Sequence, residues 1–326
     1  MTSEPMGEFE LIARHFTRPG RTASAGLALG VGDDCALLQP APGQLLAVST
    51  DMLVEGRHFL STVAPERLGH KALAVNLSDL AACGAEPLGC TLALALPRAD
   101  DSFVAPFARG LFALADAHGI ELVGGDTTAG PLNICITVFG QVPVGQALLR
   151  SGAKAGDELW VSGGTLGDAR LALEVFRGTQ TLPGAAFDAV RRAMETPQPR
   201  VALGLALRGL ATSAIDISDG LLGDLGHVLR RSAVGAVVRV DALPRSAVLA
   251  AQPPALQHEC LLAGGDDYEL LFTAPASQHS AVLAAGNRAG VAVTHCGSIE
   301  AAPGLRVVDG GGRAVATPWR SFDHFA

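Results

Sequence analysis

Aspartates recur at the ends of short apolar runs in this chain, usually beside Gly, Ser or Thr. Two carboxylates about 4 Å apart repel by roughly 4 kcal/mol at an effective dielectric constant of about 20, so several can converge only if a cation compensates them. Mg²⁺ suits this task because it prefers oxygen ligands and binds phosphates together with carboxylates. A single Gly-Asp pair is better explained as a turn or a helix cap. The repetition instead predicts a multi-metal phosphate site at six segments: Gly32-Asp33-Asp34, Ser49-Thr50-Asp51, Asn76-Leu77-Ser78-Asp79, Gly124-Gly125-Asp126, Asp216-Ile217-Ser218-Asp219 and Gly265-Asp266-Asp267.

Two of these segments offer oxygen ligands in close succession. Ser49, Thr50 and Asp51 present two hydroxyls and a carboxylate on consecutive residues, as an Mg²⁺ site would need. Asn76 and Asp79 are three residues apart on a predicted helix, so they share a face that could touch the same ions. For Asn76, a hydrogen bond that packs the helix is an equally good interpretation.

Phosphate-binding loops of the common kinds are missing from the sequence. It contains neither a G-x-x-x-x-G-K-[ST] loop nor the set of protein-kinase motifs. The segment 163–167 is rich in glycine and precedes a predicted helix, but a flexible connector explains it more simply. Asp219 opens another helix, where it could cap the first turn or lie beside an anion bound at the helix N-terminus.

Composition limits the classes of protein that fit. With 326 residues and 48% hydrophobic residues, the chain suits two globular domains. A net charge of −8 argues against a nucleic-acid partner, which would need a basic surface. Lys71 and Lys154 are the only lysines, so phosphate must be bound by arginine, backbone N–H groups or metal ions. Arg150 begins a polar, glycine-rich turn that we take as the boundary between domains 1–148 and 149–326.

Targeting and redox features favour a cytoplasmic protein. The acidic N-terminal residues lack the basic and apolar regions of a signal peptide, and no apolar run reaches the roughly 18 residues of a membrane span. The six cysteines show no C-x-x-C spacing and lie mostly among apolar residues. Buried thiols in a reducing compartment are therefore expected in place of disulfides or a zinc site.

The elements that would position these residues alternate between strands and helices in both halves, which predicts an α/β (α+β) fold with two mixed-sheet domains. Leu73, Leu77 and Leu80 should form the buried side of a long helix over 65–84. The other predicted helices span 7–16, 103–118, 168–176, 201–210 and 221–231. Predicted strands span 27–30, 36–38, 45–49, 91–96, 120–123, 134–142, 158–162, 213–217, 237–240, 268–274, 291–296 and 305–308, and 178–187 reads as an exposed loop.

One internal similarity has two explanations. The segment around Asp33 and Asp34 is similar to the segment around Asp266 and Asp267, with an apolar Leu-Leu pair following each. Either two acid-tipped hairpins face one cleft, or two small turns converged in composition.

Taken together, these motifs resemble the thiamine-monophosphate kinase family nearly from end to end and in order, from Gly7-Glu-Phe9 to Phe322-Asp-His-Phe325. The matching motifs also include Arg150-Ser-Gly-Ala and Gly264-Gly-Asp-Asp-Tyr-Glu-Leu270. The wider group resembles aminoimidazole ribonucleotide synthetase. The resemblance implies an N-terminal α/β domain that forms a homodimer through its sheet, followed by a C-terminal α/β domain. It also implies ATP as co-substrate, several Mg²⁺ ions and conversion of thiamine monophosphate to thiamine diphosphate, the final step in making that cofactor.

The resemblance further implies a role for each matching residue. The residues that look like Mg²⁺ ligands, including the aspartates essential for catalysis, are Asp34, Ser49, Thr50, Asp51, Asp79, Asp126, Asp216 and Asp219. Those that look like ATP contacts are Gly125, Asp126, Arg150 and Ser218, and those that look like thiamine-phosphate contacts are His58, Asp266 and Phe322. The chain has Asp266 where the family usually has Glu, one methylene longer, so a water could bridge this carboxylate to the substrate.

The chemistry inferred from the residues agrees with this family. A phosphate monoester has a second pKa near 6, so the acceptor oxygen is largely ionised at pH 7 and no general base is required. Bridging cations would instead lower the repulsion between two polyanions. Three alternatives stay open at this point: a selenophosphate synthetase, a hydrogenase-maturation enzyme, and a non-catalytic nucleotide or Mg²⁺ sensor. The first two should carry a reactive cysteine near one end, whereas the ends here read Met-Thr-Ser-Glu-Pro-Met and Phe-Asp-His-Phe-Ala.

Overall fold

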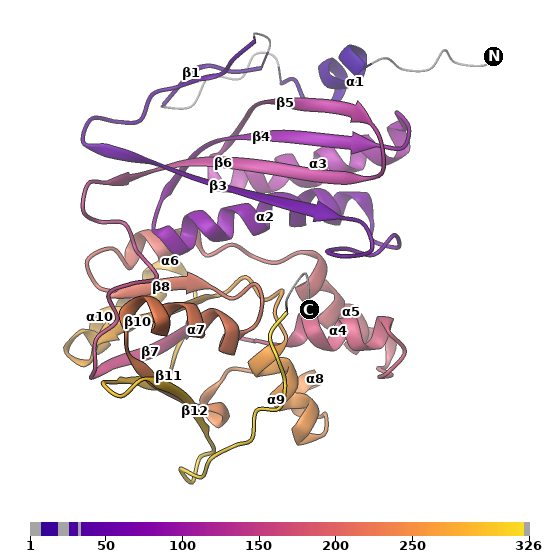
Figure 1. Ribbon diagram of the computed structural model, residues 1–326. Coiled ribbons are helices and arrows are strands. Elements are labelled where there is room, and N and C mark those ends of the chain that lie inside the picture. The colour runs from indigo at the N-terminus through magenta and orange to yellow at the C-terminus, as the bar shows by residue number, and fades with distance from the viewer. Residues whose placement is uncertain (1–7, 19–25, 32–33, 323–326) are drawn as a thin grey trace. The chain divides into compact units, whose positions relative to one another are not determined.

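A computed structural model describes residues 8–18, 26–31 and 34–322, with the side chains of Glu8 and Phe9 left aside (Figure 1). The contacts divide these residues into two units. The N-terminal unit holds the described residues up to Leu80 together with Glu86–Val144. The C-terminal unit holds Ala81–Ala85 and the described residues from Gly145 onward. Gly32 and Asp33, and with them half of the internal similarity, lie outside the described residues.

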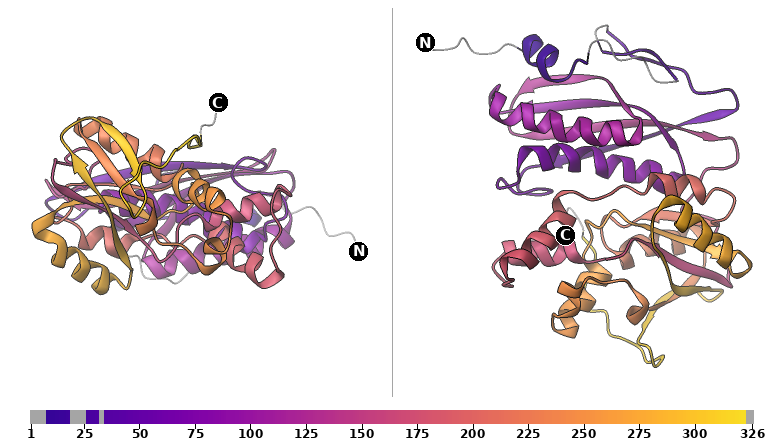
Figure 2. Two further views of the ribbon diagram at one scale, coloured as in Figure 1. Left: turned by 90° about the horizontal axis from the view of Figure 1, so that it is seen from below. Right: turned by 180° about the vertical axis from the view of Figure 1, so that it is seen from behind.

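The N-terminal unit is built on a four-stranded sheet with the order β3-β6-β4-β5. Strands β4 and β5 are parallel, and the other neighbours are antiparallel. Two helices, α2 and α3, cover one face of this sheet (Figures 1 and 2). The elements of the unit are α1 (Glu8–His15), β1 (Leu27–Leu29), β2 (Leu37–Leu38), β3 (Gln44–Val54), α2 (Pro65–Cys83), β4 (Glu86–Leu96), α3 (Asp101–His118), β5 (Glu121–Ala129) and β6 (Asn133–Pro143).

Helix α2 confirms the buried stripe predicted from helical spacing. Leu73, Leu77 and Leu80 are each at most 1% exposed. Helix α3 begins after Asp100, whose side chain accepts a hydrogen bond from the Ser102 N–H and so satisfies a donor that the helix leaves unpaired. Gly119 ends α3 in the left-handed conformation, as its position after the last apolar turn predicted.

Strand β3 separates two kinds of side chain by simple alternation. Ser49, Asp51 and Leu53 are partly or fully buried, whereas the residues between them are exposed. The exposed positions include Val48 and Met52, both more than half exposed. Because successive side chains of a strand point to opposite faces, this pattern puts polar groups on the covered face and an apolar row on the other.

The C-terminal unit is built on a six-stranded mixed sheet with the order β12-β9-β11-β7-β10-β8. Only the β12–β9 pair is parallel. Its strands are β7 (Asp157–Ser162), β8 (Ser213–Asp216), β9 (Gly235–Arg239), β10 (Leu270–Pro275), β11 (Val293–Glu300) and β12 (Gly304–Val308). Its helices are α4 (Asp168–Phe176), α5 (Gly184–Glu195), α6 (Val201–Ala206), α7 (Leu221–Ser232), η1 (Val240–Ala242), α8 (Ala247–Ala250), α9 (Pro254–Ala263), η2 (Ala276–Gln278) and α10 (His279–Ala289).

This sheet is buried on both faces. On one face, Val161 and Leu271 belong to a cluster that also contains Leu221 and Leu225 of α7. On the other face, Trp160 stacks on Phe272 of the neighbouring strand with ring centroids 6.3 Å apart. A strand covered on both sides loses the alternation of polar and apolar residues, which is why β7 and β10 read as continuous apolar runs.

The architecture confirms the predicted fold class, but some local predictions were wrong. Helix α4 has the predicted bounds, whereas the segment predicted as an exposed loop over 178–187 contains the first turn of α5. Helices α9 and α10 were not predicted, because α9 shows little contrast between its faces and α10 is rich in alanine and other small residues. No helix within the described ranges is long and apolar enough to span a membrane.

Candidate functional site

The N-terminal unit brings two of the predicted segments together where β3 crosses α2. The Ser49 hydroxyl donates to a carboxylate oxygen of Asp79 over 2.5 Å. The backbone N–H of Asp51 donates to Oδ1 of Asn76 over 3.0 Å. We call Ser49, Asp51, Asn76 and Asp79 the β3–α2 group. The spacing argument that put Asn76 and Asp79 on one face is therefore confirmed.

Asn76 has a structural role within this group. It is fully buried, and its Nδ2 donates to the carbonyl of Ala72 one turn earlier in α2. Its other end accepts the N–H of Asp51, so the side chain joins helix to strand. The packing interpretation of Asn76 accounts for both contacts.

Thr50 does not offer its side chain together with Ser49 and Asp51, as the sequence had suggested. Its hydroxyl lies 2.9 Å from that of Thr137 on β6, and the residue is exposed. The reason is the period of two in a strand, which turns the middle of three consecutive residues to the opposite face. Only the main-chain carbonyl of Thr50 could therefore serve an ion bound by its two neighbours.

Gly125 and Asp126 occupy strand β5, in register with Leu92 and Ala93 of β4. Gly125 has φ +148°, and a Cβ at this position would lie 1.9 Å from the carbonyl oxygen of Leu92. Only glycine fits so close an approach of two strands. Asp126 and Asp34 are both exposed.

Taken within either unit, no three of the described carboxylates predicted as ligands lie within 4.8 Å of one another. Ser49 and Asp79 are predicted ligands that contact each other directly. The oxygen donors of the β3–α2 group, a hydroxyl and two carboxylates, nevertheless match the ligand preference of Mg²⁺. The assignment of individual ligands stays a prediction.

His58 follows β3 in a tight turn. Its Nδ1 accepts the backbone N–H of Val54 over 2.9 Å. This contact gives His58 a structural hydrogen bond, and it directs the ring proton to Nε2.

The C-terminal unit gathers three predicted segments at the end of β8, although they are more than 40 residues apart in the sequence. The Asp266 N–H donates to the Ser218 carbonyl over 2.8 Å, and the Phe322 N–H donates to the Asp219 carbonyl over 3.0 Å. Asp216 is the last residue of β8 and is 4% exposed. We call Asp216, Ser218, Asp219, Asp266 and Phe322 the β8 loop group.

The backbone of this group is unusual. Gly265 has φ +69°, and a Cβ there would lie 2.6 Å from the Ser218 carbonyl oxygen. Asp266 and Tyr268 also adopt left-handed conformations, with φ of 62° and 51°. Left-handed residues other than glycine carry strain and persist only where surrounding contacts fix them. The hydrogen bonds to Ser218 and Ile217 supply that support.

Asp224 fixes the backbone of the loop after β8, a role that the sequence analysis did not predict. Its carboxylate accepts the backbone N–H groups of Ser218, Asp219 and Gly220, each over 3.1 Å. Burial, and then the charge of Asp219, raise the pKa of Asp224 to about 7, although the three hydrogen bonds act in the opposite direction. Its position four residues after Gly220, in the first turn of α7, was the available signal.

Two further acids secure the loops without having been predicted. The Asp267 carboxylate accepts the N–H of Gly167 over 2.8 Å, which joins the glycine-rich segment 163–167 to this region. Burial raises the pKa of Asp267 well above its usual range. Glu269 accepts the Ser162 hydroxyl over 2.5 Å and pairs with Arg200 through both carboxylate oxygens. In the sequence Asp266-Asp267-Tyr268-Glu269, the first and third residues thus have the left-handed backbone of the loop. The side chains of the second and fourth residues hold neighbouring segments in place.

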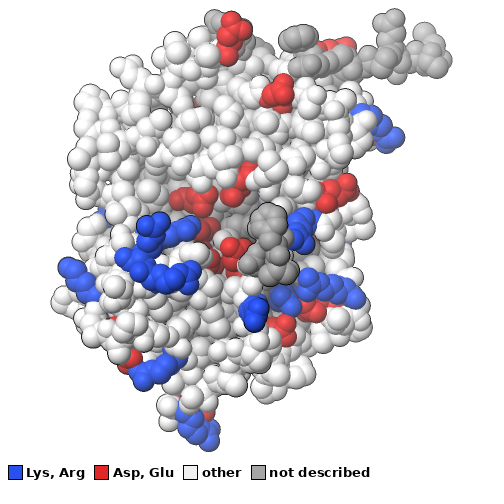
Figure 3. Space-filling view, in the orientation of Figure 1, with Lys and Arg blue, Asp and Glu red and all other residues white. Residues whose placement is uncertain are grey.

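Arg150 lies in a positively charged region of the C-terminal unit. The charges of Arg230, Arg150 and Arg231 lower the pKa of His227, after the larger effect of its burial. Figure 3 shows the Lys and Arg side chains of the face in view gathered mainly over this unit. Such a cluster suits a phosphate-bearing ligand.

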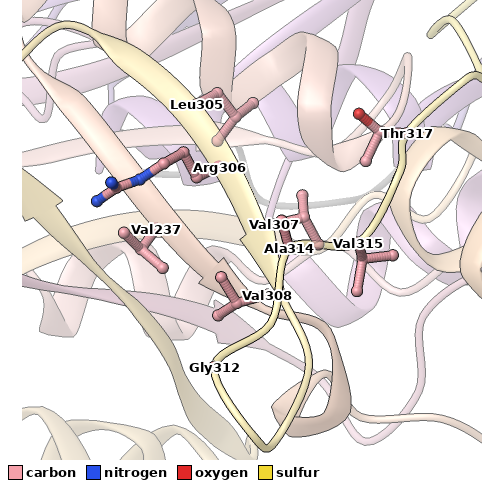
Figure 4. A pocket seen from close by; sticks show the side chains of 9 residues that line it. All are labelled: Val237, Leu305, Arg306, Val307, Val308, Gly312, Ala314, Val315 and Thr317. Atoms are coloured by element: carbon pink, nitrogen blue, oxygen red, sulfur yellow. The ribbon is translucent and has the colours of Figure 1, made fainter.

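One pocket and the cysteines lie outside these groups, and neither has a role in the proposed site. A shallow apolar pocket lies at the β9–β12 edge, and none of the predicted site residues lines it (Figure 4). All six cysteines are free thiols, and burial raises the pKa of Cys90, Cys260 and Cys296 to about 12. Those three behave as small apolar residues, as expected.

Comparison with known proteins assigns both units to described families. Residues 32–142 match the N-terminal domain of AIR synthase related proteins, and residues 154–310 match the C-terminal domain of the same proteins. Together these matches cover most of the chain.

Individual relatives are similar over nearly the full length. Thiamine-monophosphate kinase of Salmonella typhimurium is 45% identical over 98% of both chains. The crystal structure of thiamine-monophosphate kinase from Stenotrophomonas maltophilia K279a is 44% identical and superposes with a TM-score of 0.83, covering 94% of this chain and 96% of that one. The structure of AaThiL complexed with AMPPCP and TMP is 30% identical, with a TM-score of 0.75 and coverage of 88% and 89%.

Proposed function

The chain belongs to the thiamine-monophosphate kinase family and phosphorylates thiamine monophosphate to thiamine diphosphate with ATP, and we propose that it does so by direct in-line transfer assisted by several Mg²⁺ ions. The observation that carries the activity is 45% identity over 98% of both chains. The complex of AaThiL with AMPPCP and TMP supports binding of both substrates by one fold.

The reaction places two demands on the protein. Donor and acceptor are both anionic, and the acceptor phosphate is largely ionised at neutral pH. The protein must therefore reduce repulsion and align the two phosphates, whereas it has no proton to remove. Bound Mg²⁺ would supply the positive charge that draws the phosphates together.

The residues of the N-terminal unit would hold metal. Asp51, Asp79 and Ser49 offer oxygen atoms on the covered face of the sheet, and Asn76 fixes the strand against the helix. Asp34 and Asp126 are exposed carboxylates that complete the proposed acid set of this unit. Gly125 permits the close strand approach beside Asp126 and would contact ATP through its backbone.

The residues of the C-terminal unit would bind metal and both substrates. Asp216 and Asp219 flank Ser218 at the end of β8, which supports roles as Mg²⁺ ligands and an ATP contact. Arg150 would bind a nucleotide phosphate. Asp266 and Phe322 would hold the aminopyrimidine and the cationic thiazolium of thiamine monophosphate.

Release of ADP tests the function directly. Purified enzyme with ATP, Mg²⁺ and thiamine monophosphate should release ADP in a coupled assay and form thiamine diphosphate, and ADP release should stop when the acceptor is omitted. EDTA should abolish the reaction and added Mg²⁺ restore it. ADP release that does not depend on thiamine monophosphate, or turnover in the presence of EDTA, would contradict the proposal.

Homodimer formation through the N-terminal sheet is a separate part of the proposal. Leu46, Val48 and Met52 expose a row of apolar side chains on the face of β3 opposite Ser49 and Asp51. Soluble monomers seldom leave such a row uncovered, so it supports an interface between copies of the chain. Sedimentation at micromolar concentration should give a dimer, and Val48→Asp should shift the mass toward the monomer. A monomer mass for the parent chain would exclude this assembly.

A further inference from the structure

Glu158, His279 and His295 form a cluster in the C-terminal unit that the proposed reaction does not use. Each offers one ligand atom, and these atoms lie within 4.8 Å of one another. In the part of the chain that the structure describes, this is the one group of three such residues at that spacing. The cluster lies on the sheet face of Trp160, where His279 begins helix α10.

Strand pairing brings the three residues together. His295 of β11 is paired with Trp160 of β7, and Glu158 lies two residues before Trp160 on the same face. Because His295 is directly opposite Trp160, its side chain lies on the same face of the sheet as Trp160 and Glu158. Trp160 contacts both imidazoles, with centroids 4.9 Å from His279 and 5.3 Å from His295. The indole therefore packs against both rings.

The hydrogen bonds set the chemistry that each ring presents. Nε2 of His295 lies 2.8 Å from the Gly297 carbonyl, which can only accept, so Nε2 carries a proton. In the neutral ring, Nδ1 is then an unprotonated nitrogen, and it lies 3.9 Å from Oε1 of Glu158. A metal ion bound between this nitrogen lone pair and the carboxylate would be attracted by both.

The separations fit a metal ion of zinc size. Oε1 of Glu158 lies 3.1 Å from Nδ1 of His279 and 3.9 Å from Nδ1 of His295. Ligand atoms about 2.0 Å from a tetrahedral Zn²⁺ are about 3.3 Å apart, which lies between those two distances. The His279 side chain is 42% exposed, so it can adjust to close the site. The Gly297 carbonyl accepts a hydrogen bond from Nε2 of His295. A metal-bound histidine commonly donates its other ring N–H to a carbonyl in this way.

We propose that Glu158, His279 and His295 bind one Zn²⁺, with water as the fourth ligand. Two imidazoles and one carboxylate favour zinc over Mg²⁺, since nitrogen donors select the softer ion. The ion would join the first turn of α10 to β7 and β11 and would stabilise that part of the C-terminal unit. Binding of Zn²⁺ by Nδ1 of His279 would replace the hydrogen bond between His279 and Glu158, and the neutral ring would then carry its proton on Nε2.

Zinc content and ligand variants test this site. Untagged protein is stripped with a chelator, saturated with Mg²⁺ to occupy the carboxylate sites, and dialysed against Zn²⁺. We expect one Zn²⁺ per chain by elemental analysis and a higher Tm than in Mg²⁺ alone. The double variant His279→Ala/His295→Ala should lose both effects, and His258→Ala, which removes a histidine of α9 outside the cluster, should keep both.

A spectroscopic test covers the case in which the double variant fails to fold. Ni²⁺ bound at the cluster should quench the fluorescence of Trp160, which Trp319→Phe isolates from the second tryptophan. Glu158→Gln keeps the side-chain shape but loses the charge, and it should weaken the quenching by about tenfold or more. Absence of bound Zn²⁺ in the parent protein, or equal binding in the double variant, would overturn the site. Neither readout depends on kinase activity.

Discussion

The β3–α2 group and the β8 loop group position their residues by different means. In the first, the proposed ligands lie on a strand and a helix and contact each other directly, as Ser49 and Asp79 do. In the second, the proposed ligands lie at the last residue of β8 and on the loop that follows it, and hydrogen bonds hold the backbone of that loop. The buried acids Asp224 and Asp267 provide part of that support without being proposed ligands.

This difference predicts whether a mutation should change activity alone or both activity and stability. Elements with internal backbone hydrogen bonds need little further support, so loss of the Asp51 or Asp79 carboxylate should remove chemistry and leave the fold. Loops lack such internal bonds, so loss of a supporting acid should disturb both position and stability. The following predictions test this contrast, from the largest expected effect to the smallest.

Asp79→Asn should reduce kcat by roughly 10²- to 10³-fold, the size seen when one group that stabilises transition-state charge is removed. The amide still accepts the Ser49 hydroxyl, and it relieves repulsion among nearby carboxylates. The melting temperature without metal should therefore equal or exceed that of the parent. Asp51→Asn should behave in the same way.

The control for these variants is Asp188→Asn, which changes an exposed acid on α5. It should keep full turnover. Full turnover in Asp51→Asn or Asp79→Asn would contradict the metal-ligand assignment. A large fall in the melting temperature of these variants would contradict the expectation that only the β8 loop group depends on its acids for stability.

Asp224→Ala should affect both activity and stability. It leaves three backbone N–H groups without their acceptor, and each buried unsatisfied group costs about 1–3 kcal/mol unless water enters. We expect kcat to fall by roughly 10- to 100-fold, as for residues that orient metal ligands. Asp224→Asn keeps one acceptor oxygen and should recover part of the stability, measured by denaturant unfolding. Wild-type stability in Asp224→Ala would show that the loop does not depend on this acid.

Phe322→Ala should raise the Michaelis constant for thiamine monophosphate by roughly 2- to 30-fold. A cation–π contact contributes about 0.5–2 kcal/mol, and each 1.4 kcal/mol is about tenfold in an equilibrium constant. The constant for ATP should barely change. Leu283→Ala, a comparably exposed apolar residue of the same unit, serves as control. Equal effects on both substrates, or none, would make Phe322 a packing residue.

Asp266→Glu should have the smallest effect. It restores the length usual in the family, so the Michaelis constant for thiamine monophosphate should stay equal or decrease. Glutamate is less favourable than aspartate in the left-handed conformation of this residue, φ 62°, and we expect a stability loss of no more than about 1 kcal/mol. A large rise in the Michaelis constant would show that the shorter acid fits the substrate better than the longer one.

Much of the fold could be predicted from local sequence patterns. The buried stripe of α2, the bounds of α4 and nearly the full extents of β6 and β7 follow from apolar spacing and from Gly, Pro and Asp at the boundaries. Two of the missed helices lack a clear local pattern, since α9 shows little contrast between its faces and small residues dominate α10. Their formation depends on burial against the rest of the unit, which a local pattern does not encode.

The sequence by itself determined which residues could bind metal and phosphate, because oxygen donors, glycines and scarce lysines are properties of composition and order. It also determined that Asn76 and Asp79 share a face, because the helical period is fixed. Only the tertiary structure decided that Thr50 faces away from Asp51, since a strand turns alternate side chains apart. It alone brought Phe322 and Asp266 to the loop after β8 and put Asp224 beneath it. Those contacts join segments far apart in the chain, and sequence distance carries no information about which backbone groups meet in space.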